Sequence, residues 1–300
     1  MEKTRLLYKA NKKTKRKINW FFIVIMVFLT AYAVSLFLPL FWGLINSFKT
    51  AFDFDTNRLG LPKPFTLENY QNSLKLLYVP VQDGLGQRNV LVPELFLNSI
   101  LYALGSAFLQ TLACCFVAYV TQKFPWKLCK VIYGIVIVTM ILPIIGAMPS
   151  EIRILKTLRI YDTIWGAWAL KSNFLGIYFL VFHAMFKGVP KALPEAAEID
   201  GAGHFTVLFR IMMPMVIKTF ATVMLIYFVQ YWNDYQVPLV YIPSHPTLTY
   251  AMYKAALSTR ISSVPGRLAV CLVVFIPIFL VFIAFHKRLM GNVSMGSVKG

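Results

Sequence analysis

Residues 195–214 read EAAEIDGAGHFTVLFRIMMP, a short polar segment that separates two strongly apolar stretches of the chain. Its polar residues include three acids and two nearby glycines, namely Glu195, Glu198, Asp200, Gly201 and Gly203. The rest of the chain suits a different environment, because 58% of its 300 residues are hydrophobic and only 14% are charged. Soluble domains carry about 25% charged residues, so this composition indicates an integral membrane protein.

Several apolar stretches are long enough to cross a membrane, since a helix needs about 20 predominantly apolar residues to do so. Six stretches qualify, at 20–45, 96–121, 130–148, 164–186, 213–231 and 268–285. The sequence therefore predicts an all-α, polytopic membrane protein with six transmembrane helices. The predicted transmembrane domain is 20–290, preceded by a basic segment, 1–19, and followed by a tail, 291–300.

The distribution of positive charge predicts the orientation of the chain. The formal net charge is +18, and eight lysine and arginine residues precede the first span. Cytoplasmic segments of membrane proteins carry an excess of these residues, so the segment 1–19 is predicted to be a cytoplasmic anchor, not a nucleic-acid-binding arm. With six spans in the cell membrane, both termini are then cytoplasmic. The loops 46–95 and 232–267 lie outside, and the loop 187–212 lies inside.

The alternative for the N-terminus is a cleaved signal peptide, because a basic region precedes an apolar one. The apolar run continues to Ile45, which is too long for an ordinary signal peptide, so we expect the segment to be retained.

The sequence offers no pattern typical of an enzyme or a metal site. Its cysteines form no C-x-x-C pair and its histidines match no metal spacing, so we expect no metal or cofactor on this chain. It also lacks the G-x-x-x-x-G-K-[ST] motif of ATP-hydrolysing P-loop proteins. Any ATP-driven activity would therefore depend on a partner.

The polar segment itself is predicted to form two short helices joined at glycines. Pro194 followed by Glu195 suits a helical first turn, where proline loses no hydrogen bond and a carboxylate meets the positive end of the helix dipole. The spacing of Phe205, Leu208, Phe209 and Met212 predicts one apolar face of a second short helix. A helix resting on lipid headgroups is the alternative, but it would carry Lys and Arg, and this polar face is acidic. The pattern favours a protein partner.

These residues resemble the EAA loop of permease subunits of binding-protein-dependent ABC importers. The pattern is carried by Glu195-Ala196-Ala197, by Gly201, and by Ile211-Met212-Met213-Pro214, where the family prefers Leu to Met213. Asp200-Gly201-Ala202 is similar to the carbohydrate-uptake, MalG-like branch. Further similarity is spread over the chain, at 46–49, 65–70, 98–99, 161–166, 232–234 and the C-terminal 296–300.

The resemblance implies half of a translocation pore for sugars or oligosaccharides. The implied partners are a homologous second permease subunit, a cytoplasmic ABC ATPase dimer that binds ATP and Mg²⁺, and an extracellular or periplasmic sugar-binding protein. The residues implied to couple to the ATPase are Glu195, Ala196, Ala197, Asp200, Gly201, Ala202 and Pro214, with the tail residues Val298, Lys299 and Gly300 as a second contact.

Polar residues near the outer ends of two predicted spans are candidates for the substrate path, namely Lys171, Asn173, Trp232, Asn233, Asp234 and Tyr235. An ionisable group at membrane depth usually faces a cavity or a partner, but Lys171 could instead snorkel to the interface or pair with another helix. The second group combines a stacking surface with donors and acceptors, as sugar sites require. An aromatic belt with a helix-ending turn is an equal alternative for it.

A self-contained secondary transporter or channel driven by an ion gradient is the alternative function. Such a protein would be expected to carry paired acids within its spans, and no Asp or Glu lies well inside any of the six.

Overall fold

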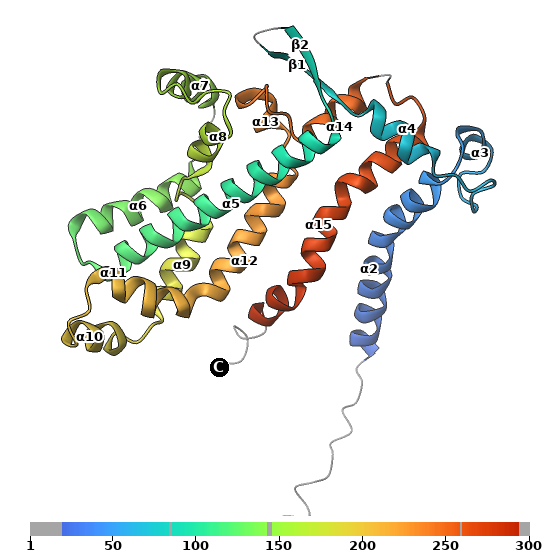
Figure 1. The fold of residues 1–300 in the computed structure, drawn as a ribbon. Coiled ribbons are helices and arrows are strands. Elements are labelled where there is room, and N and C mark those ends of the chain that lie inside the picture. The colour runs from blue at the N-terminus through green and yellow to red at the C-terminus, as the bar shows by residue number, and fades with distance from the viewer. Residues whose placement is uncertain (1–19, 84–85, 143–145, 259, 294–300) are drawn as a thin grey trace, which may run out of the picture.

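The computed structural model describes residues 20–83, 86–142, 146–258 and 260–293, with side chains described as far as Phe285 and not for Asp83. The predicted N-terminal segment 1–19 and the tail contact at Val298, Lys299 and Gly300 lie outside the described residues. Within these ranges the chain is mostly helical (Figure 1).

Four of the six predicted spans are continuous helices. They lie in α2 (Trp20–Ser47), α5 (Val92–Lys123), α12 (Met213–Trp232) and α15 (Val264–Val293). By length and composition, the described residues contain four helical stretches able to cross a membrane, at Trp20–Ser47, Val92–Lys123, His204–Trp232 and Val264–Phe285. The chain is therefore a multi-pass membrane protein.

The third predicted span is shorter than expected. Helix α6 (Lys127–Ile141) has 15 residues, and the next helix, α7 (Met148–Thr157), is a separate element. Leu142 adopts an extended conformation after α6 and is followed in the sequence by Pro143. A residue before proline is pushed away from the helical region, so the helix ends where apolar composition alone predicted that it would continue.

The fourth predicted span is not one helix. It consists of α8 (Ile164–Lys171) and α9 (Ile177–Lys187), separated by an irregular segment, 172–176. Gly176 has φ +132°, a conformation that side chains other than glycine rarely adopt, and it ends any helical path at that point. Backbone that is not helical is tolerated at membrane depth only where protein or a cavity surrounds it.

The two predicted outside loops are folded. The first contains α3 (Ala51–Thr56), α4 (Glu68–Leu76) and an antiparallel hairpin of β1 (Val79–Asp83) and β2 (Gly86–Val90), so the chain is not purely helical. The second contains α13 (Gln236–Tyr241) and α14 (Leu248–Leu257). It folds back on the start of α5, where the Asn98 side chain donates to the Pro246 carbonyl at 3.1 Å.

Helix α5 is the centre of the packing, with α12, α9 and α8 against it (Figure 1). Small side chains permit this close approach, as is typical of membrane helices. At Gly105 an added Cβ would lie 2.1 Å from the Trp168 ring of α8, and the Trp168 indole donates to the Leu101 carbonyl at 2.9 Å. Three helices are thus held at fixed positions around one axis.

Candidate functional site

The polar segment begins with α10 (Ala192–Ile199), the first of the two predicted short helices. Pro194 and Glu195 lie in its first turn, as expected. The helix ends because Gly201 has φ +83°, and the Ala202 amide then donates to the Ala197 carbonyl at 2.9 Å. No atom lies within 4 Å of a Cβ added at Gly201, so the backbone conformation alone requires glycine there.

The second predicted helix is not separate, because α11 (His204–Thr206) and the π-helix η1 (Val207–Met212) run directly into α12. Its predicted apolar face is also wrong in part, since Val207, Leu208 and Met212 are buried while Phe205 and Phe209 are exposed by 79% and 53%. A π-helix has i→i+5 hydrogen bonds and a longer turn, so a 3.6-residue spacing does not hold through Phe209. Pro214 lies in the first turn of α12.

A charge cluster ties α10 to the end of α5. The Lys123 ammonium donates a hydrogen bond of 2.6 Å to Glu198 Oε1, and His204 Nδ1 lies 3.7 Å from the same oxygen. The hydrogen bond from Lys123 lowers the pKa of the Glu198 carboxyl below its ordinary value, so the carboxyl is charged at neutral pH. The polar segment is thus attached to the central helix.

The outer face of the same segment is apolar and uncovered. Ile199 and Phe205 expose 86% and 79% of their surface, whereas Ala197 and Ala202 pack against the core. Two large hydrophobic side chains therefore project from a short loop whose small residues anchor it. Such an arrangement fits insertion into a groove of another protein.

Two of the predicted substrate-path residues meet at the break in the fourth span. Lys171 Nζ lies 3.7 Å from Asp234 Oδ2 and 5.3 Å from the centre of the Tyr231 ring. The Tyr102 hydroxyl donates to the same Asp234 oxygen at 2.8 Å. The side chains of Lys171 and Asp234 are 23% and 17% exposed, so the pair is largely shielded but still accessible. Lys171 of α8 thus contacts an acid just beyond the end of α12.

The other substrate-path candidates do not join this pair as a group. Trp232 is 2% exposed and its indole donates to the Val274 carbonyl at 3.2 Å, so its role is packing against α15. Asn233 is exposed and caps its own helix by donating to the Val229 carbonyl. Tyr235 stacks on Tyr253, with ring centres 4.2 Å apart. Asn173 is exposed within the irregular segment 172–176.

Sequence reasoning missed Lys123 and Tyr102, the partners of Glu198 and Asp234. Each partner is distant in the chain, by 75 and 132 residues respectively. The one available signal for Lys123 was its position as a cation at the end of a predicted span on the same side as the polar segment. Nothing in the local sequence around Tyr102 indicated its partner.

Long apolar helices joined by a short, glycine-bounded polar loop define a multi-pass membrane protein. Residues 110–294, more than half of the chain, match the family described as "Binding-protein-dependent transport system inner membrane component". The chain belongs to this family. It is therefore a permease component and not an enzyme, as the missing P-loop predicted, and the energy source of such systems is a separate ATPase.

Relatives cover nearly the whole chain at low identity. The diacetylchitobiose uptake system permease protein NgcG of Streptomyces coelicolor is 26% identical over 90% of this chain and 87% of its own length. The multiple sugar-binding transport system permease protein MsmG of Streptococcus mutans is 27% identical over 96% of this chain and 100% of its own.

The fold is similar to that of a chain from a solved structure, a bacterial ABC transporter involved in the import of the acidic polysaccharide alginate. The TM-score is 0.71 with 20% identity, covering 91% of this chain and 98% of the other. At this identity the likeness shows that the two chains share a fold.

Proposed function

We propose that this chain is one of two homologous permease subunits of an ATP-driven importer for sugars or oligosaccharides. The named substrates of relatives support the substrate class: diacetylchitobiose for NgcG and arabinooligosaccharides for the AraQ protein of Halalkalibacterium halodurans, which is 24% identical. In this proposal α6 is the third span and α8 with α9 is the fourth. Both termini are cytoplasmic, because eight cations precede α2.

The polar segment is proposed to dock on the cytoplasmic ATPase dimer. The observation that carries this proposal is the pair of exposed hydrophobic side chains, Ile199 and Phe205, on a loop that the Lys123–Glu198 bond ties to α5. Exposed apolar side chains rimmed by polar residues are typical of protein-binding surfaces. The proposed coupling residues are Glu195, Ala196, Ala197, Asp200, Gly201, Ala202 and Pro214, with a second contact at Val298, Lys299 and Gly300.

The nucleotide and Mg²⁺ are proposed to bind only on the partner ATPase, and a sugar-binding protein outside the cell delivers the substrate. Folded outside loops support this delivery, because the hairpin of β1 and β2 and helices α13 and α14 provide an ordered surface there. This chain then contributes a passage for the sugar, not the chemistry of ATP hydrolysis.

The Lys171–Asp234 pair is proposed to line the sugar path. It lies beside the irregular segment 172–176, where backbone groups are not used in a helix, and the Tyr231 ring offers an aromatic face. Sugars are bound by planar hydrogen-bonding groups together with aromatic stacking, and this corner has both kinds of group. Asn173 belongs to the same segment and is a further candidate.

A charge reversal tests the docking role. Glu195→Lys replaces an exposed acid in the first turn of α10, and Glu68→Lys makes the same change in the first turn of α4, in the outside loop. We expect Glu195→Lys to reduce the ATPase retained on the purified permease and to uncouple transport, while both variants insert normally. Equal ATPase retention in wild type and Glu195→Lys would contradict the docking role.

Copurification tests the assembly and the substrate class. The tagged chain is purified from its cells in mild detergent and the retained proteins are identified; we expect a second permease, an ATPase and a sugar-binding protein. The recovered binding protein is then screened against mono- and oligosaccharides for thermal stabilisation. Gradient-driven uptake by this chain reconstituted alone, without an ATPase, would overturn the importer proposal in favour of a secondary transporter.

A further inference from the structure

A cavity of about 550 Å³ opens between the ends of α5 and α9, the beginning of α6, and α10. Its volume is in the range typical of small-molecule sites. Four lysines line it, namely Lys123, Lys130, Lys187 and Lys191, against two acids, Glu195 and Glu198. None of the proposed substrate-path residues contributes to its wall, so this is a second site. It lies next to the polar segment proposed to dock on the ATPase, called the docking loop below.

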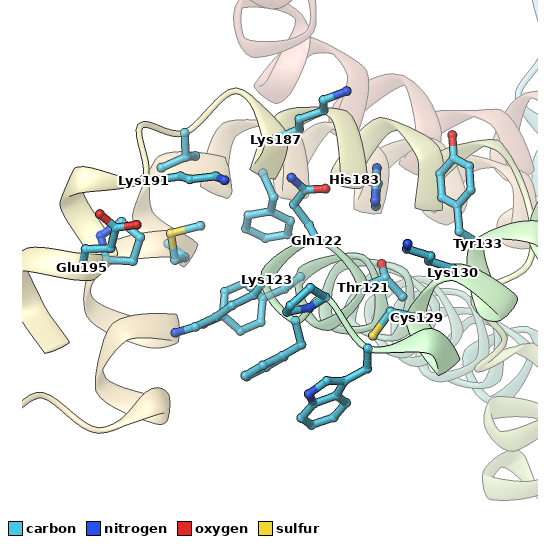
Figure 2. A pocket seen from close by; sticks show the side chains of 18 of the residues that line it. Thr121, Gln122, Lys123, Cys129, Lys130, Tyr133, His183, Lys187, Lys191 and Glu195 are labelled. Carbon is cyan, nitrogen blue, oxygen red and sulfur yellow. The ribbon is translucent and has the colours of Figure 1, made fainter.

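The positive charge of the cavity is not balanced by its acids. Lys123 is already bonded to Glu198, and Figure 2 shows Lys187 pointing out of the cavity. Lys130 and Lys191 remain with one acid, Glu195, and among the residues that the structure describes neither lysine has an ion-pair partner.

These two lysines approach one space from opposite sides. In Figure 2 the amino groups of Lys130 and Lys191 point toward the middle of the cavity, and the side-chain amide of Gln122 lies between them. Ammonium and amide groups that converge without a bound partner are the donors that a phosphoryl group takes. The geometry therefore fits an anion held at the centre.

Apart from Thr121 and His183, the remaining wall is apolar, and it continues along α6. Aromatic side chains dominate it, including Tyr119, Phe124, Trp126, Tyr133 and Phe186. Residues three, seven and ten positions after Lys130 share one side of α6, and these are Tyr133, Ile137 and Met140. Tyr133 and Met140 are exposed hydrophobic residues, so an apolar strip leads from the cavity toward the surface that faces lipid.

We propose that this cavity binds the phosphodiester headgroup of an anionic glycerophospholipid, with one acyl chain along the strip of α6. This rests on the proposed orientation, which puts the docking loop and the cavity at the cytoplasmic leaflet. A soluble phosphate would use the same donors but would leave the apolar strip without a function, so the lipid accounts for more of the site. Basic pockets between membrane helices at this level are suited to anionic headgroups.

The site joins the lipid to the docking loop. Lys191 immediately precedes α10, and Glu195 of α10 lines the same cavity. A bound headgroup would therefore contact both the membrane helices and the element proposed to meet the ATPase.

Lipid retention on the assembled transporter tests the proposal. The purified assembly, with its partner subunits, is incubated in nanodiscs of phosphatidylglycerol mixed with phosphatidylcholine, and the lipids retained are counted by native mass spectrometry. Each lysine near an anionic surface contributes about fivefold to binding, so Lys130→Gln should weaken phosphatidylglycerol retention about fivefold, and Lys130→Gln with Lys191→Gln about 25-fold. Lys130→Arg keeps the charge and should bind as wild type does.

The control is Lys218→Gln, which removes an exposed lysine of α12 that does not line the cavity and should leave retention unchanged. Unchanged phosphatidylglycerol retention in the double variant would overturn the proposal. Displacement of the lipid by millimolar inorganic phosphate would instead identify a soluble anion as the ligand. Retention is measured without transport, so a transporter that binds the lipid but imports no sugar contradicts only the proposed function.

Discussion

Gly201 has a φ of +83°, so the effect of replacing it can be predicted from the backbone conformation alone, without any side-chain contact. An L-residue in a left-handed conformation costs about 1–2 kcal/mol relative to glycine. Because no atom lies within 4 Å of the added Cβ, this backbone cost is the whole effect of Gly201→Ala. It corresponds to a change of about 5–30-fold in the ratio of the native loop conformation to its alternatives.

The assay is the affinity of the purified ATPase for the permease, measured together with ATPase activity stimulated by the binding protein. When only part of a population is competent to bind, the apparent Kd rises in proportion. We expect Gly201→Ala to raise the apparent Kd by up to about 5–30-fold. Gly201→Asn should have a smaller effect, because asparagine tolerates the left-handed region better than alanine does.

The matched control is Gly203→Ala. Gly203 belongs to the same loop and also has open space around an added Cβ, but its φ is −69°, which alanine adopts without strain. Gly203→Ala should therefore bind the ATPase as wild type does. Equal loss in the two alanine variants would refute the conformational argument and indicate that the loop tolerates no side chain at either glycine.

Three further outcomes follow from the contacts of the membrane helices and the loop. Asp234→Asn weakens a hydrogen bond from Tyr102 to a charged group and should lower the free energy of unfolding by about 1.5–3 kcal/mol, measured as a lower midpoint of thermal denaturation in detergent. Gly105→Ala overpacks the α5–α8 contact and should lower the free energy of unfolding by about 1–3 kcal/mol. Gly134→Ala, with open space around its added Cβ, should leave it unchanged. Equal stability of the two variants would contradict the close packing at Gly105. The hydrogen bond from Lys123 lowers the pKa of Glu198, so the bond to α5 is complete above the ordinary carboxyl pKa and is lost as the pH falls through the lowered pKa. The distribution of distances between spin labels on α5 and α10 should therefore broaden only at acidic pH.

The sequence predicted the long spans well because apolar length is a direct physical requirement of the bilayer. It assigned α2, α5 and α12 within four residues at each end, whereas α15 begins four residues before the predicted span and ends eight residues beyond it. It did not predict the break at 172–176, since apolar composition does not distinguish one long helix from two short helices with an irregular segment between them. Gly176, with φ +132°, interrupts the helical path there, and composition does not show which glycines adopt such a conformation.

The loop was predicted from motif and charge, and its main correction concerns periodicity. The helical spacing of 3.6 residues grouped Phe205 and Phe209 with the buried residues, but both are exposed: Phe205 lies in α11, and Phe209 lies in the π-helix η1, whose turn is longer. Pairings such as Lys123 with Glu198 were out of reach, because a contact between residues 75 positions apart depends on the fold and not on local sequence. The roles of the coupling and substrate-path residues stay predictions.

The junction between η1 and α12 has a mechanical consequence. In Figure 1 the segment that begins at the α11 label runs into the lower end of α12, which then rises at an angle to it. Both a π-helix and a proline such as Pro214 are causes of helix bending. The short arm is about 13 Å long and the long arm about 30 Å, at 1.5 Å per residue. A rigid junction would make the two arms rotate together as one bent body. If the proposed ATPase partner moves the end of the short arm, the far end of the long arm, beside Asp234, would be displaced about twice as far. Release of the ATPase would reverse this displacement.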